Sequence, residues 1–402
     1  MGLVIDFLTD DEDIVDLCTR YWSLDEQGCF VHRVADLLLP PGAATGRVAA
    51  FVAEHCHAYD SDILCQRCGQ PCVIVTSRSE YLRRSRWSLP RTCDDCRRSE
   101  ADREQAARDA AIEEKRSRIR EHFDPGEQGT LTAPDELSFE EAIALLALFR
   151  LASPEGLGAM SPVQEADGIL APTPELATDL LLLLYRNGHI AVAPESQLSA
   201  FTDDGQRFYP LRVTWLPPVD GEGDPAGVMT SLGSVFREGA WPEEWSGEYL
   251  PFWRNVARHE CLQYMRVCME EHGFEFTAGD KTKHMLDGVL ETYSPAQAYN
   301  FIWRAAKDAA AYLLRGNVSR RQAANSIVGS IQRMADRGLT EGWDVKPYRR
   351  DRRAPESTVS HVLYRVALRL RGAGIDHVPS AIAPDAAMPD GSPTLDDVSE
   401  EE

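Results

Sequence analysis

Apolar residues recur every three or four positions through most of the chain, and this spacing predicts a mainly α-helical protein of several domains. The predicted helices cover residues 11–21, 31–39, 45–55, 98–122, 136–151, 175–187, 251–271 and 281–293, followed by helices after Ser294, from Ser319 to Gly338 and from Thr358 onward. Serine is a preferred N-cap residue, and Pro295 suits the first position of a helix. Outside residues 59–97, only residues 189–192 and 211–216 are predicted to be strands.

Breaks in the pattern divide the chain into segments. They are a helical domain (1–58), a small β module (59–97), a charged helix with a linker (98–134), a helical unit with a β-hairpin (135–220), a linker (217–227), an all-helical bundle (228–371) and an acidic tail (372–402) expected to be disordered after about residue 378. In the first segment, a Pro-Pro-Gly turn followed by Thr45 as an N-cap predicts a helix-turn-helix-like arrangement. The alternative is a helical hairpin that packs on the β module. A helix followed by a hairpin, as in residues 135–220, resembles a winged helix.

Two Cys-x-x-Cys pairs stand out in the β module: Cys65 with Cys68, and Cys93 with Cys96. Such pairs can bring four thiolates to one tetrahedral ion, and a closed four-thiolate site predicts a structural zinc rather than a catalytic one. The spacer is expected to form a β-hairpin from residues 73–76 and 81–89. Cys72 is left over, and the remaining cysteines are expected in cores, namely Cys18, Cys29, Cys56, Cys261 and Cys268.

With these four cysteines the module resembles a zinc ribbon of the two-knuckle kind, which occurs in many nucleic-acid-handling and bacterial regulatory proteins. The resemblance covers less than a tenth of the chain. It implies a role in binding DNA, RNA or protein, and it does not choose among these partners.

Charge along the chain is uneven. The whole chain of 402 residues has a net charge of −22, but residues 301–371 contain 15 Lys or Arg against 6 Asp or Glu. Overall acidity does not prevent a local basic surface from binding phosphate. No apolar run approaches the length of a membrane span, and the N-terminus lacks the basic region of a signal peptide, so we expect a cytoplasmic protein.

These observations favour a regulatory or accessory protein of bacterial type that binds DNA or RNA through basic surfaces. The residues predicted to contact nucleic acid are Arg83, Arg84 and Arg86 in the β module, Lys346, Arg349, Arg350, Arg352 and Arg353 in a loop, and Arg365 and Arg369 in the last helix. The alternative for these side chains is contact with the acidic remainder of the chain.

Two other functions remain open. A scaffold within a larger complex would use the Leu-rich, acidic helix 175–187 to bind a protein partner. An enzyme would need a site in residues 228–371, where His259, Glu260, His272 and His284 could converge, although no known catalytic motif is present. An enzymatic activity is therefore uncertain and is less expected than a binding function.

Overall fold

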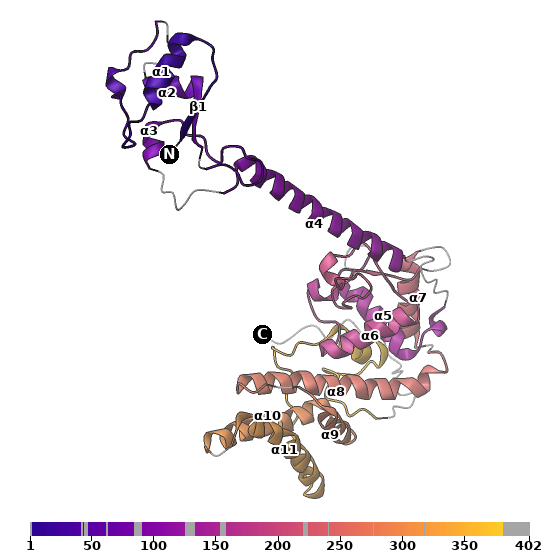
Figure 1. Ribbon diagram of the computed structural model, residues 1–402. Coiled ribbons are helices and arrows are strands. Elements are labelled where there is room, and N and C mark those ends of the chain that lie inside the picture. The colour runs from indigo at the N-terminus through magenta and orange to yellow at the C-terminus, as the bar shows by residue number, and fades with distance from the viewer. Residues whose placement is uncertain are drawn as a thin grey trace, which may run out of the picture. The chain divides into compact units, whose positions relative to one another are not determined.

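The computed structural model describes residues 2–41, 43, 47–61, 63–83, 91–124, 133–152, 158–219, 224–239, 241–275, 277–316 and 318–380 (Figure 1). The chain forms two compact units, Met1–Glu114 and Lys115–Glu402, and it is mainly helical, as the sequence predicts. No helix in the described ranges combines the length and apolar character needed to cross a membrane.

The helices of the first unit are α1 (Glu12–Trp22), α2 (Val48–His55) and α3 (Arg78–Leu82), and α4 (Asp94–His122) begins in the first unit and ends in the second. The helices of the second unit are α5 (Phe139–Ala152), α6 (Pro174–Arg186), α7 (Pro225–Glu238), α8 (Trp245–Glu271), α9 (Asp280–Leu290), α10 (Pro295–Leu314), α11 (Arg320–Thr340) and α12 (Thr358–His361). The strands are β1 (Leu3–Phe7), β2 (Cys56–Asp60), β3 (Ala191–Val192) and β4 (Trp215–Leu216).

The first unit is built on an antiparallel pair of strands that the helical prediction for residues 1–58 missed. β1 pairs with β2 so that Leu3 lies opposite Asp60 and Phe7 lies opposite Cys56. The core beside them includes Cys18, Trp22 and other apolar residues of α1 and α2. Each strand has only five residues, and each finds its partner about 50 positions away, so neither gives a strong local signal.

The predicted helix over residues 31–39 is wrong. The structure has only one short 3₁₀ turn there, Val34–Asp36, and Leu38 is 86 % exposed. Leu37 packs into the core of the first unit, but Val31, Val34 and Leu38 are exposed, so the apolar residues of this stretch do not share one buried face. Helical periodicity alone therefore does not make a helix here. The helix-turn-helix-like arrangement loses its first helix and is not formed. The predicted cap Thr45 lies outside the described residues.

The second unit has one continuous core that runs from Ile119 to Ile375. α8 is central to it, with α5 and α10 packed against opposite sides (Figure 1). α7 lies partly in the predicted linker 217–227 and contributes Phe236, which stacks on Trp245 with ring centroids 5.3 Å apart. Residues on both sides of that linker therefore share a single core.

Helix ends in the second unit mostly follow the sequence signals. Ser294 and Ser319 both cap their helices, each with a glutamine three residues later that returns the hydrogen bond. α11 continues past Gly338 to Thr340, which corrects the predicted end. A Cβ at Gly338 would lie 2.6 Å from the Tyr293 hydroxyl oxygen, so this glycine makes room for the Tyr293 side chain and does not mark a helix end.

Two predictions for the C-terminal part need correction. After α12 the chain makes a π-helical turn, Val362–Ala367, and Arg369 follows it with φ +48°, so Arg369 does not extend the helical face of His361 and Arg365. The predicted tail 372–402 begins inside the fold, because Ile375 is 1 % exposed and its carbonyl accepts a hydrogen bond from the Ala296 N–H. Residues 381–402 lie outside the described ranges.

β3 and β4 pair antiparallel, with Ala191 opposite Leu216 and Val192 opposite Trp215. Both strands were predicted, although each has only two residues and is shorter than expected. Trp215 is fully buried, so this hairpin packs into the core. Most of the leucines of α6, the helix that precedes this hairpin in the chain, are also buried.

Candidate metal centre and cationic segment

The first cysteine pair lies on a tight turn. Leu64 forms an antiparallel bridge with Pro71, and the N–H of Cys65 donates to the carbonyl of Gln70 at 2.7 Å. Gly69 closes the turn with φ +74°, a conformation that side-chain-bearing residues rarely adopt. The turn presents both thiols of the pair in the way expected of a metal-binding knuckle.

The second pair is differently built. Cys93 directly precedes α4, and Cys96 lies in its first turn, where the Cys96 N–H points to the Cys93 sulfur at 3.4 Å. A backbone hydrogen bond from Gln66 N–H to Arg91 carbonyl connects the two pairs. The four ligands thus come from one β-turn and one helix N-terminus, rather than from two β-turns.

The four sulfurs meet at one point. Those of Cys65, Cys68, Cys93 and Cys96 all lie within 4.8 Å of one another, and the Cys68 and Cys93 sulfurs are 3.6 Å apart. Four sulfurs about 2.3 Å from a tetrahedral ion would be separated by about 3.8 Å, so the donor set fits a metal ion. In the described parts of the chain no other group of His, Cys, Asp or Glu is gathered in this way.

Among the residues that the structure describes, the cysteine cluster has almost no apolar core of its own. Its buried members are Cys65, Cys72 and Cys93, with Ile63 and Val73 packed at the side, and this cluster is separate from the core of α1 and α2. Backbone N–H groups of Cys93 and Cys68 lower the pKa of Cys65 to about 6. A segment with so little apolar burial needs another source of folding energy, which a metal ion held by the four cysteines would supply.

The predicted β-hairpin in the spacer is wrong where the structure describes it, because Tyr81 and Leu82, predicted to begin the second strand, lie in α3; residues 84–89 lie outside the described ranges. Val75 pairs with Ala58 of β2, and α3 begins three residues later, capped by the Ser77 side chain. Arg78 in this helix is buried: its guanidinium donates to the Tyr21 carbonyl at 2.6 Å and covers the Phe30 ring at 4.4 Å. Part of the arginine and aromatic content of this module therefore packs against the first unit's own core.

The three arginines predicted to contact nucleic acid from this module have different placements. Arg83 is exposed at the end of α3, and its Nε donates to the Ser79 carbonyl. Arg84 and Arg86 lie outside the described residues.

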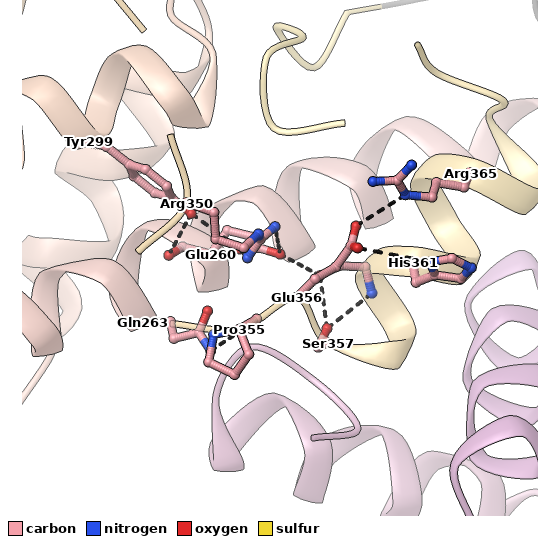
Figure 2. A network of polar contacts seen from close by, with 10 residues as sticks. Glu260, Gln263, Tyr299, Arg350, Pro355, Glu356, Ser357, His361 and Arg365 are labelled. Atoms are coloured by element: carbon pink, nitrogen blue, oxygen red, sulfur yellow. Dashed lines mark hydrogen bonds and ion pairs between the residues drawn. The ribbon is translucent and has the colours of Figure 1, made fainter. Parts of the chain in front are cut away.

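Arg350, predicted to contact phosphate, forms a buried ion pair instead of an exposed contact. Both terminal nitrogens donate to the carboxylate of Glu260, at 2.5 and 2.9 Å, and Glu260 is fully buried in α8 (Figure 2). The hydroxyls of Ser360 and Tyr299 also donate to this carboxylate, at 2.5 and 3.2 Å. Burial would lower the pKa of Arg350, but the adjacent Glu260 carboxylate outweighs it and raises that pKa. This network joins α8, α10, α12 and the loop.

Three more of the predicted arginines contact groups within the chain. Arg353 pairs with Glu271 and Asp351, and Arg365 pairs with Glu356 at 3.6 Å (Figure 2). Arg369 donates to the carbonyls of Phe236 and Arg237 at the end of α7. Arg353 and Arg365 keep about half of their side-chain surface exposed, so their predicted contact with phosphate stays a prediction.

The remaining loop cations are exposed. Lys346, Arg349 and Arg352 have no ion pair or hydrogen bond from their charged groups to any part of the chain that the structure describes. We call them the cationic segment. Arg304 and Lys307 on α10 are also exposed. Neither is among the residues predicted from the sequence to contact nucleic acid, although their spacing of three residues places them on one helical face.

The residues considered for an enzyme do not converge. Glu260 belongs to the network with Arg350. His259, the next residue of α8, bonds instead to the Thr173 hydroxyl at 2.6 Å, and burial lowers its pKa to about 4. His284 is exposed, with its Nδ1 at 2.8 Å from the carbonyl of Asp280 in the same helix.

Most of the leucines of α6, the helix considered as a binding site for a protein partner, pack inside the second unit. Leu180, Leu181 and Leu184 of α6 are buried in the core of the second unit. Its two other leucines in this run, at 182 and 183, are half-buried. Cys29, expected in a core, is exposed, whereas Cys18, Cys56, Cys261 and Cys268 are buried as expected.

Comparison of the chain with family models, with curated proteins and with solved structures finds no match. The cysteine group and the exposed cations are therefore the features that indicate a function.

Proposed function

We propose that this protein binds nucleic acid through the cationic segment and that its four-cysteine group holds a structural zinc ion. The observation that carries the proposal is the exposure of Lys346, Arg349 and Arg352, three cations within seven residues that have no partner in the described parts of the chain. Unpaired, exposed Lys and Arg side chains are the groups that neutralise phosphates.

The surroundings of the segment support the same proposal. Residues 301–371 have a net charge of +9 within a chain of −22, so the positive charge is concentrated where the segment lies. Neutralised phosphates release bound counterions, and the binding that results weakens steeply with salt. An acidic chain with one basic surface binds polyanions at that surface and repels them elsewhere.

Zinc is proposed from the donor set. Four thiolates in a tetrahedral arrangement suit zinc or an iron–sulfur centre, and a four-cysteine zinc site has no open position for a substrate. The ion would therefore stabilise the fold of the segment from Cys65 to Cys96 and would not take part in catalysis. Elemental analysis tests this: one zinc per chain is expected, and visible absorbance from iron would contradict it.

Binding is tested with variants of the full zinc-loaded chain. The triple variant Lys346→Gln, Arg349→Gln, Arg352→Gln removes the cationic segment. The control triple variant Arg186→Gln, Arg207→Gln, Lys283→Gln removes the same charge from exposed positions elsewhere on the second unit. Affinity for a labelled oligonucleotide should fall about 10-fold or more in the first variant and much less in the control. Equal losses would show that only the overall charge matters and would contradict the proposal.

A further inference from the structure

A cleft lies beside the cationic segment, between α10 and the chain that follows α11. Its volume is about 430 Å³, within the range of small-ligand pockets. Asn300 and Arg304 of α10 form one wall, and Trp343, Lys346 and Tyr348 line the other.

Hydrogen bonds to backbone carbonyls hold the two walls together. The Asn300 side-chain nitrogen donates to the Lys346 carbonyl at 3.0 Å, and the Tyr348 N–H donates to the Ala296 carbonyl at 2.8 Å. The Gln297 side chain donates to the Val345 carbonyl at 3.1 Å. The cleft is therefore built into the fold and does not depend on loosely held side chains.

The lining combines three kinds of chemistry. Arg304 and Lys346 supply positive charge, with Asp344 as the one carboxylate. Trp343 and Tyr348 are half-buried aromatic rings. The third feature is a buried acceptor: Asn300 is 3 % exposed, and its side-chain oxygen has no hydrogen-bond partner in the described parts of the chain. The bond from the Asn300 nitrogen to Lys346 fixes which amide atom is the oxygen.

A ligand that satisfies all three features is flat and aromatic, carries an anionic group and has an N–H donor. A nucleotide meets these conditions: its base stacks on aromatic rings, its phosphate pairs with cations, and its exocyclic or ring N–H can donate to the Asn300 oxygen. We infer that this cleft takes one unpaired nucleotide of a single strand whose neighbouring phosphates contact the cationic segment. This inference rests on the proposed function and specifies its ligand.

A paired base cannot enter such a cleft, because in a duplex both of its faces are stacked on neighbouring bases. The protein should therefore prefer single-stranded nucleic acid to a duplex of the same sequence. The phosphates of a duplex would still contact the cationic segment, so the duplex should bind, but more weakly than the single strand.

The test measures fluorescence anisotropy of a labelled 12-nucleotide strand and of its duplex with the full zinc-loaded chain. Trp343→Leu and Tyr348→Leu each remove one ring of the cleft, and Tyr312→Leu removes an exposed ring of α10 that does not line it. Each cleft variant should weaken single-strand binding about 10-fold and leave duplex binding within about 2-fold, while Tyr312→Leu changes neither. Circular dichroism confirms that each variant is folded.

The outcomes separate this inference from the proposed function. If the cleft variants bind the single strand as tightly as wild type, or weaken the duplex equally, the cleft inference is overturned, while the triple variant of the cationic segment still tests nucleic-acid binding. If the wild-type protein binds neither strand nor duplex at low salt, both are overturned. A free 5′-mononucleotide that binds as tightly as the strand would assign the cleft to free nucleotides and overturn the strand preference.

Discussion

Substitutions of two adjacent arginines in the loop should have very different effects on stability. The side chain of Arg350 is largely buried within the second unit and pairs with Glu260, whereas Arg349 is exposed. Arg350→Ala leaves a fully buried carboxylate with only two hydroxyl donors, Ser360 and Tyr299. Arg349→Ala removes only an exposed charge.

The magnitude follows from burial. Removing one partner of a buried ion pair costs about 3–5 kcal/mol, because the remaining charge stays desolvated without its counter-charge. Glu260 is 0 % exposed and the Arg350 side chain 15 % exposed, so little water can compensate. A surface substitution such as Arg349→Ala changes the free energy of unfolding by less than about 0.5 kcal/mol.

Urea denaturation of the full chain measures this difference. Most tryptophans lie in the second unit, so their fluorescence reports its unfolding. For a slope of about 3 kcal/mol per M, Arg350→Ala should lower the midpoint by about 1 M or more, and Arg349→Ala should leave it nearly unchanged. A double variant, Glu260→Met with Arg350→Met, should lose less than Arg350→Ala because no charge is left buried. A loss below about 1 kcal/mol for Arg350→Ala would refute the reasoning.

Three further predictions concern the metal, pH and backbone. Cys65→Ser should reduce bound zinc well below one per chain and raise amide exchange around the cysteine cluster, whereas Cys29→Ser, at an exposed cysteine outside that cluster, should change neither. Burial and the adjacent Arg258 lower the pKa of His259 to about 4 from 6.5. The unfolded chain therefore binds more protons between these values, and about 3 kcal/mol of stability present above pH 6.5 should be lost as pH falls toward 4. Gly374→Ala should cost about 3 kcal/mol or more, because its Cβ would lie 2.4 Å from Tyr364 at φ +73°, whereas Gly372→Ala shares the strained φ but meets only the end of one side chain.

Each of these has a clear contrary result. Zinc content unchanged in Cys65→Ser would place the ion elsewhere. For the pH prediction, His259→Gln is the control, and it should flatten the fall in stability between pH 6.5 and 4; an unchanged profile would assign the fall to other groups. Equal losses for Gly374→Ala and Gly372→Ala would mean that backbone strain alone, and not the contact with Tyr364, decides the cost.

The sequence was sufficient where the signal is local. Each cysteine pair was found because its two members are three residues apart, and the serine caps were found because the cap and its glutamine are three residues apart. α7 had such a signal too: Asp224 caps it and Pro225 takes its first position, yet the stretch was read as a linker because of the glycines and prolines before it.

The sequence was insufficient where partners are distant. β1 finds β2 about 50 residues away, and no local pattern distinguishes Arg349 from Arg350. Only the fold shows that Glu260, 90 residues earlier, meets the second of these arginines. The same limit applies to the cleft, because α10 and the segment after α11 come together only through packing.

The central claim, that the cationic segment binds nucleic acid, is tested most directly by the salt dependence of binding. Affinity for a single strand is measured from about 50 to 300 mM salt for wild type and for the Lys346, Arg349, Arg352 triple variant. Log affinity plotted against log salt should give a straight line for wild type and a slope less steep by about 2 for the variant, since three phosphate contacts are lost at about 0.7 each. Identical slopes for the two proteins, or no binding at the lowest salt, would contradict it.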